Sequence, residues 1–187
     1  MDIKNRLREL LTEAEESKGN KYGCVMAYLK YDKSDWKKLQ DMIEEDDLST
    51  SDGEDNREDN PHVTILYGLH KEVKDSEIKE KVDNITKLNI KLDKISCFDG
   101  DDFDVLKFEI ISDEIRGLNK DFGKLPHTNT FDTYQPHCTI AFLKKGLGKK
   151  YMDKLNGNID IEVSPDKIVY SKIDGSKIDY KLKNKNP

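Results

Sequence analysis

Residues 61–68 read PHVTILYG, and residues 136–143 read PHCTIAFL. Both stretches contain proline, histidine, one variable residue, threonine and isoleucine in that order, followed by further apolar residues. The chain has four histidines, and two of them, His62 and His137, fall in this shared pattern. The apolar residues around each motif favour β-strands. We therefore predict that the fold is organised around two similar strands, and that the similarity reflects an internal duplication.

The composition indicates one folded domain with a strongly solvated surface. The chain has 187 residues, which suits a single domain over 1–187 with a substantial core. Charged residues make up 37% and hydrophobic residues 35%, but the apolar residues occur in periodic runs. The net charge of −6 argues against a protein that holds long duplex nucleic acid on a broad basic face. A small anionic substrate in a local positive site is compatible with that charge.

The cysteines and the apolar runs indicate the cellular compartment of the protein. Cys24, Cys97 and Cys138 are odd in number and widely spaced, which predicts neither a disulfide framework nor a zinc site. The first residues lack the apolar segment of a signal peptide, and no run approaches the length of a membrane span. We expect a cytoplasmic protein that does not bind membranes. The oligomeric state stays open.

Periodicity predicts the remaining elements and an α+β fold. Helices are expected at residues 1–18, at 34–43 with Ser34 as N-cap, at 75–85, at 112–122 and at 151–155. Strands are expected at 22–31, 62–69, 88–95, 105–110, 137–143, 159–163 and 167–173. A last strand is expected after a turn at Gly175 and ends at Leu182, before a tail at 183–187. We predict two antiparallel β-sheets with helices outside.

Residues 44–60 differ from the rest of the chain. They are acidic, almost free of apolar side chains and rich in Ser, Asp, Gly and Asn. Such a stretch cannot bury enough surface to hold itself in a core. We therefore predict a mobile loop directly before the first motif, which is either a solvated insertion or a lid over the site.

The repeated motif indicates acid–base chemistry. Residues i and i+2 of a strand point to the same face, so His62 shares a face with Thr64, and His137 with Thr139. If the two strands face one another, a neutral histidine can accept a proton while a protonated one donates. The threonine hydroxyls can stabilise charge on phosphoryl oxygens. This scheme requires neither a metal nor a cofactor.

The paired His-x-Thr motifs resemble those of the 2H phosphoesterase superfamily, which includes RNA 2′,3′-cyclic phosphodiesterases (2′-5′ RNA ligase-like proteins) and 2′-5′ oligoadenylate phosphodiesterases. The resemblance implies a bilobal fold with a central cleft, metal-independent phosphodiesterase activity, and catalytic roles for His62, Thr64, His137 and Thr139. The Ile-Leu-Tyr that follows the first motif and the composition are similar to phage-encoded members, including anti-CBASS enzymes that destroy cyclic oligonucleotide immune signals. That likeness implies action in a host cytoplasm.

Three further residues are candidates for substrate binding. Tyr67 and Tyr134 flank the motifs and could stack on a base, or could pack in the core. Lys144 could attract a phosphate. Cys138 alternates away from the histidine face and is expected to be a buried small residue. The favoured substrate is a cyclic nucleotide or cyclic oligonucleotide; an enzyme for RNA or tRNA ends and a protein that sequesters nucleotides without turnover are the alternatives.

Overall fold

The computed structural model describes residues 21–49, 56–129, 133–157 and 161–182. The strands in these ranges are β1 (Gly23–Tyr31), β2 (His62–Leu69), β3 (Lys91–Asp99), β4 (Phe103–Ile111), β5 (His137–Lys144), β6 (Val163–Ser171) and β7 (Lys177–Lys181). The helices are α2 (Lys33–Asp41), α3 (Asp75–Asp83), α4 (Asp113–Phe122), α5 (Gly148–Leu155) and a 3₁₀ turn, Glu45–Asp47. No helix in the described ranges has the length and apolar character needed to cross a membrane.

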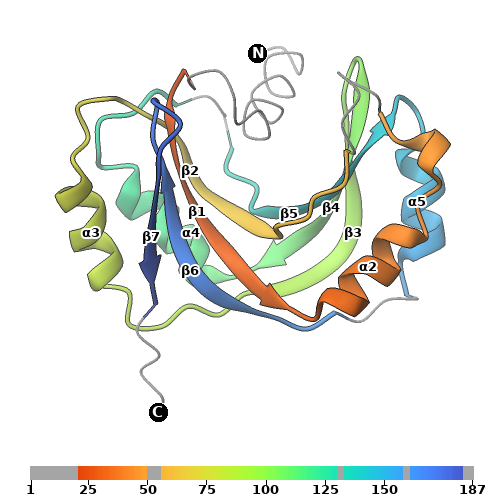
Figure 1. Ribbon diagram of the computed structural model, residues 1–187, viewed down its shortest axis with the longest axis horizontal. Helices are drawn as coiled ribbons and strands as arrows, with labels where there is room; N and C mark the ends of the chain where they lie inside the picture. The colour runs from red at the N-terminus through yellow and green to blue at the C-terminus, as the bar shows by residue number, and fades with distance from the viewer. Residues whose placement is uncertain (1–20, 50–55, 130–132, 158–160, 183–187) are drawn as a thin grey trace.

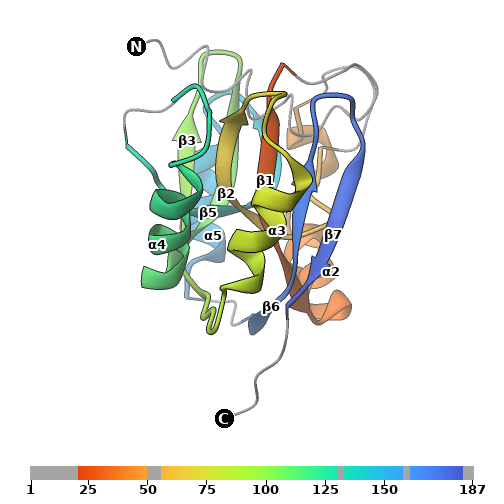
Figure 2. The same ribbon diagram turned by 90° about the vertical axis from the view of Figure 1, so that its left-hand side faces the viewer.

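The strands form two antiparallel sheets. One has the strand order β2-β1-β6-β7 and the other the order β3-β4-β5. Both sheets curve around a shared concave side, with α3 and α4 outside the first sheet and α2 and α5 outside the second (Figure 1). In the view turned by 90°, α3 stands in front of the first sheet and α4 lies beside α3, toward the β2 edge of that sheet (Figure 2). The predicted α+β fold with two sheets and outer helices is confirmed.

The order of elements repeats, as the duplicated motif indicated. The chain runs β1-α2-β2-α3 through the first motif and β4-α4-β5-α5 through the second. In each sheet the motif strand lies at an edge, next to β1 or β4. On its other side, β1 pairs with β6 and β4 pairs with β3. The two halves of the chain therefore each contribute strands in the same arrangement.

The core lies on the helix side of both sheets, and it fixes which way the motif side chains point. Val63 and Ile65 of β2, and Cys138 and Ile140 of β5, are all fully buried in one apolar cluster. Because neighbouring side chains of a strand alternate between its faces, the histidine and threonine of each motif point to the opposite, concave side. The alternation predicted from the sequence is confirmed.

Two local predictions were wrong. The N-cap of α2 is Asp32, whose Oδ1 accepts hydrogen bonds from the N–H groups of Ser34 and Asp35. Residues 159–163 and 167–173 were predicted as separate strands, yet β6 runs as one strand from Val163 through Pro165 to Ser171, and residues 159 and 160 lie outside the described residues. Proline is tolerated there because it lies before the part of β6 that pairs with β7, a pairing that begins at Lys167 in the described residues.

The ends of the 44–60 stretch are attached to β5, which the loop prediction missed. Leu48 forms a bridge with Leu143, and Arg57 with Ala141. The N–H of Ser49 donates to the carbonyl of Phe142 (3.0 Å). Backbone pairing of this kind needs no apolar side chains, so composition gave no sign of it. Residues 50–55, like the predicted helix at 1–18 and tail at 183–187, lie outside the described residues.

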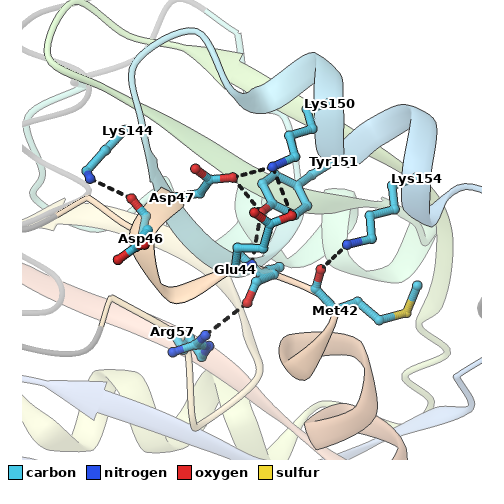
Figure 3. Close-up of polar contacts among 10 residues, drawn as sticks. Met42, Glu44, Asp46, Asp47, Arg57, Lys144, Lys150, Tyr151 and Lys154 are labelled. Atoms are coloured by element: carbon cyan, nitrogen blue, oxygen red, sulfur yellow. Dashed lines mark hydrogen bonds and ion pairs between the residues drawn. The ribbon is translucent and has the colours of Figure 1, made fainter.

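Charged side chains hold the first part of this stretch against α5 (Figure 3). The Lys150 ammonium binds the carboxylates of Glu44 (3.0 Å) and Asp47 (2.6 Å). The Tyr151 hydroxyl donates to Asp47 Oδ2 (2.8 Å) and accepts from the N–H of Glu44 (2.9 Å). The Lys150 ammonium and the Tyr151 hydroxyl hold the pKa of the Asp47 carboxyl below its usual range. Acidic residues that suggested a solvated loop are therefore partly used as anchors.

Candidate active site

The two motif strands meet where the sheets adjoin. β2 is the edge of one sheet, β5 is the edge of the other, and the two strands lie side by side (Figure 1). Residues of β2 contact residues of β5, so the second motif strand lies directly beside the first. The Tyr134 hydroxyl donates a 2.7 Å hydrogen bond to the carbonyl of Thr64. The fold thus brings together the two motifs, which are separated by some seventy positions in the sequence.

Both imidazoles are anchored in the same way. Nδ1 of His62 lies 2.9 Å from the carbonyl oxygen of Asn60, and Nδ1 of His137 lies 2.8 Å from that of Gln135. A carbonyl oxygen can only accept, so Nδ1 carries the hydrogen in each ring. In the neutral ring the lone pair is then on Nε2. Each histidine is therefore set to exchange a proton through Nε2.

Aromatic rings also contact the two histidines. Tyr28, the neighbour of His62 across β1 and β2, stacks on it with ring centroids 5.4 Å apart and planes at 20°. Phe98 of β3 meets His137 edge to face, with centroids 5.0 Å apart. Burial raises the pKa of the Tyr28 phenol, which therefore stays neutral. These contacts restrict how far each imidazole can turn. Neither aromatic was identified from the sequence, because both depend on strand register.

Glu58 adds a carboxylate beside the first motif. Its Oε2 lies 3.9 Å from Nδ1 of His62, and its Oε1 accepts a 2.8 Å hydrogen bond from the N–H of Asn60. Its backbone N–H donates to Ile140 of β5. The carboxylate is therefore fixed by the attachment of residues 56–58 to the second motif strand. Sequence reasoning missed it because it lies in the stretch interpreted as a loop.

Lys107 lies on the concave face beside the second motif. It is the direct neighbour of Thr139 in the pairing of β4 and β5, so the two side chains share a face. Lys107 is 5% exposed. Its ammonium donates to Ser96 Oγ (2.7 Å) and lies 4.2 Å from the centroid of the Phe98 ring. A buried lysine is unusual, and the sequence offered no sign of it within an apolar strand.

The three predicted substrate-binding residues all make contacts within the protein. Tyr67 is buried with Cys24, Met26 and Val169, and its ring meets that of Tyr22 edge to face. Tyr134 packs against the core through its ring and bonds Thr64 through its hydroxyl. Lys144 donates to the carbonyl of Asp46 (Figure 3). A role for these residues in binding substrate stays a prediction.

Cys138 is fully buried, as predicted. Burial raises the pKa of its thiol well above the usual range, and the charge of Glu58 raises it further. The thiol therefore remains protonated and is a poor nucleophile. In the described ranges, no three His, Cys, Asp or Glu side chains come together as a metal site.

A surface pocket of about 500 Å³ lies beside the end of β1 and α2. Tyr31, Trp36 and Arg57 are among its lining residues, and none of the four motif residues lines it. Its lining carries both lysines and carboxylates, which gives it no clear preference for a ligand charge. We therefore place the candidate active site at the junction of β2 and β5.

Comparison with known proteins gives a structural match. No family model and no curated protein matches the sequence. Among solved structures, Usb1 of Kluyveromyces marxianus with uridine monophosphate matches with a TM-score of 0.52 and 11% sequence identity. The match covers 88% of this chain and 99% of that chain. This chain therefore shares the two-sheet fold of Usb1 over most of its length.

Proposed function

We propose that the chain is a phosphodiesterase that acts on a nucleotide-sized substrate with two histidines as acid and base. The observation that carries the proposal is the matched pair of imidazoles at the junction of two sheets. Both are bound through Nδ1 to a backbone carbonyl two residues earlier, and both belong to adjoining edge strands. His127 has the same Nδ1 contact to a carbonyl two residues earlier, so what distinguishes the motif histidines is the threonine at i+2 and their place on two adjoining edge strands.

The proposed reaction divides proton transfer between the two rings. The nucleophile is water, or a 2′-hydroxyl of the substrate, and it attacks phosphorus to form a new P–O bond. One neutral histidine accepts the proton of the nucleophile at Nε2, while the other, protonated histidine donates its Nε2 proton to the leaving oxygen as the old P–O bond breaks. The hydroxyls of Thr64 and Thr139 bind the non-bridging oxygens, where negative charge increases.

Two lines of evidence support a nucleotide substrate. The paired His-x-Thr motifs resemble those of 2H phosphoesterases, and the chain shares its fold with Usb1, whose matched structure contains uridine monophosphate. The favoured substrate is a cyclic nucleotide or cyclic oligonucleotide, as in the phage anti-CBASS enzymes that the sequence resembles. Hydrolysis at RNA ends is the second candidate, and the nucleotide in the Usb1 structure favours it.

The direct test is turnover of a substrate panel in the presence of EDTA. The panel contains 2′,3′-cyclic mononucleotides, 2′-5′ and 3′-5′ dinucleotides, cyclic di- and trinucleotides, and short RNAs with a 2′,3′-cyclic phosphate end. Products are identified by mass spectrometry. We expect one class to be cleaved without metal, and His62→Ala and His137→Ala each to lower kcat by about 10²–10⁴-fold.

The two remaining histidines provide matched controls. His70 and His127 have no Thr at i+2, and their contacts are with Glu72, Thr128 and Leu125. His70→Ala and His127→Ala should leave the rate within about threefold, provided that thermal unfolding shows a folded protein. Tight binding of a panel member with no cleavage would refute the enzyme and leave a protein that sequesters nucleotides.

A further inference from the structure

We propose that Glu58 is a positioning residue for the first motif: its carboxylate keeps the hydrogen of the neutral His62 ring on Nδ1, so that Nε2 is the nitrogen that exchanges a proton with the substrate. The inference rests on the proposed function, because it takes His62 to act through Nε2. It adds to the site a residue that lies outside both motifs and acts through the histidine rather than on the substrate.

The backbone of Glu58 is held from two sides, which limits where its carboxylate can lie. Its N–H donates to the carbonyl of Ile140 on β5 (3.0 Å). Its carbonyl oxygen accepts two hydrogen bonds from α2, one from Nε1 of Trp36 (2.8 Å) and one from Nε2 of Gln40 (2.9 Å). Both of these donors belong to buried residues. Glu58 is thus tied to the second motif strand and to a helix that packs on the core.

The two carboxylate oxygens of Glu58 reach His62 by different routes. Oε1 accepts the N–H of Asn60 (2.8 Å), and the carbonyl oxygen of Asn60 lies 2.9 Å from Nδ1 of His62. Asn60 belongs to an exposed bend that precedes β2, so this hydrogen bond orients the residue that holds the ring. Oε2 lies 3.9 Å from the same Nδ1. The side chains of Glu58 and His62 are 19% and 16% exposed, so water screens this pair less than a surface pair.

These contacts favour one tautomer of the neutral ring. With the hydrogen on Nδ1, the ring N–H faces the Asn60 carbonyl and the Glu58 carboxylate, and both attract it. With the hydrogen on Nε2, the lone pair of Nδ1 would face the same two oxygens and be repelled by both. A carboxylate at Nδ1 also fixes the tautomer of the histidine in Ser-His-Asp triads. Loss of the Glu58 side chain removes one of the two oxygens and releases the residue that carries the other.

Nitrogen NMR of the histidine rings tests the proposal without any turnover. The ¹⁵N shifts of a neutral ring differ strongly between the nitrogen that carries the hydrogen and the one that does not. We would record them for the unsubstituted protein and for Glu58→Ala, at a pH where the spectra show neutral rings. Single His→Ala variants assign each signal. We expect the two His62 signals to be far apart in the unsubstituted protein and to move toward each other in Glu58→Ala, because both tautomers are then populated.

Kinetics on the substrate that the panel identifies give the second readout. The groups that contact the substrate stay in place in Glu58→Ala, so KM should remain within about twofold while kcat falls. The expected loss in kcat is about 10–100-fold, as for other groups that orient a functional histidine. Glu58→Gln keeps an oxygen for the N–H of Asn60 but lacks the charge. It should lie between the unsubstituted protein and Glu58→Ala in both readouts.

Glu72 provides the matched control. Its Oε1 lies 3.3 Å from Nδ1 of His70, which belongs to neither motif. Glu72→Ala should leave the His62 signals and kcat unchanged. His127, whose Nδ1 lies 2.9 Å from the carbonyl oxygen of Leu125, should keep its signals in Glu58→Ala. Thermal unfolding verifies that each variant is folded, and Glu58→Gln carries both readouts if Glu58→Ala does not fold.

Three results would overturn the proposal. The first is a pair of His62 signals that stays in place in both Glu58 variants. The second is a shift of these signals with no loss in kcat, and the third is a raised KM at unchanged kcat, which would make Glu58 a binding residue. Failure of the proposed function would be a separate result, because the tautomer of His62 is measured whether or not any substrate is cleaved.

Discussion

Gly68, the last residue of the first motif, is a position where one methyl group should disrupt a defined contact. Its φ is +103°, and a Cβ added there would lie 2.2 Å from the carbonyl oxygen of Thr128. A backbone oxygen cannot turn aside as a flexible side chain can. The segment around Thr128, which leads into the second motif, must therefore move away from β2 in Gly68→Ala.

The magnitude follows from what that movement breaks. The N–H of Thr128 donates to Gly68 (2.9 Å), the N–H of His70 donates to Pro126 (3.1 Å), and the His70 ring bonds Thr128 Oγ1 (2.8 Å). Loss of two or three such bonds costs about 2–3 kcal/mol. The positive φ costs a non-glycine residue about 1–2 kcal/mol more. We expect Gly68→Ala to lower the free energy of unfolding by about 3–5 kcal/mol, and Tm by on the order of 10 °C.

Two other glycines separate the effect of the positive φ from the effect of the close contact. Gly146 has φ of +86° and nothing within 4 Å of an added Cβ, so Gly146→Ala should show the backbone strain alone. Gly117 lies in α4 with open space around it, and Gly117→Ala should stabilise the protein by about 1 kcal/mol. Urea unfolding of the three variants gives the comparison. If Gly68→Ala lost no more stability than Gly146→Ala, the reasoning from the close contact would be refuted.

Three further predictions concern the anchors, the thiols and the pH dependence. Tyr151→Phe removes the hydroxyl that bonds Glu44 and Asp47, so urea unfolding should show a loss of about 1–3 kcal/mol; an unchanged midpoint would count against this anchor. Burial raises the pKa of the Cys97 thiol to about 11 and that of Cys138 further, so at pH 8 only about one Cys97 thiol in a thousand is ionised. Both should react slowly with a thiol reagent until the protein is unfolded, and faster at higher pH; rapid labelling of native Cys97 at pH 8 would contradict this. The pH profile of kcat/KM should be bell-shaped, because activity is lost when both motif histidines are protonated and again when both are neutral; a profile with one limb would argue for one titrating group.

Side-chain periodicity predicted most of the fold. Alternation in the second motif placed Cys138 on the buried face, and Cys138 is fully buried together with Val63, Ile65 and Ile140. These predictions depend on local chain geometry: in a strand, the side chains alternate between two faces, so the order of residues is enough to assign the faces. The strands predicted at 88–95 and 105–110 for the same reason overlap β3 and β4, which pair with each other.

The parts that were missed depend on contacts between distant segments. Glu58 reaches His62 because the backbone of residues 56–58 attaches to β5, and backbone pairing leaves no pattern in the side chains. Lys107 looks like an exposed strand residue until the register places it between Thr139 and Ser96. The proximity of the two motifs was a hypothesis from their similarity. Their actual arrangement depends on how the strands of the two sheets pair, which the sequence alone does not state.

The central claim is that the two motif histidines act together on one phosphorus, and kinetics of their single and double variants test it most directly. The measurement is kcat/KM of His62→Ala, His137→Ala and the double variant on the substrate that the panel identifies. Residues that act as a unit show strongly non-additive losses. We predict that each single substitution costs about 10²–10⁴-fold and that the double variant is hardly worse than either. Losses that multiply in the double variant, or full activity in either single variant, would contradict the account.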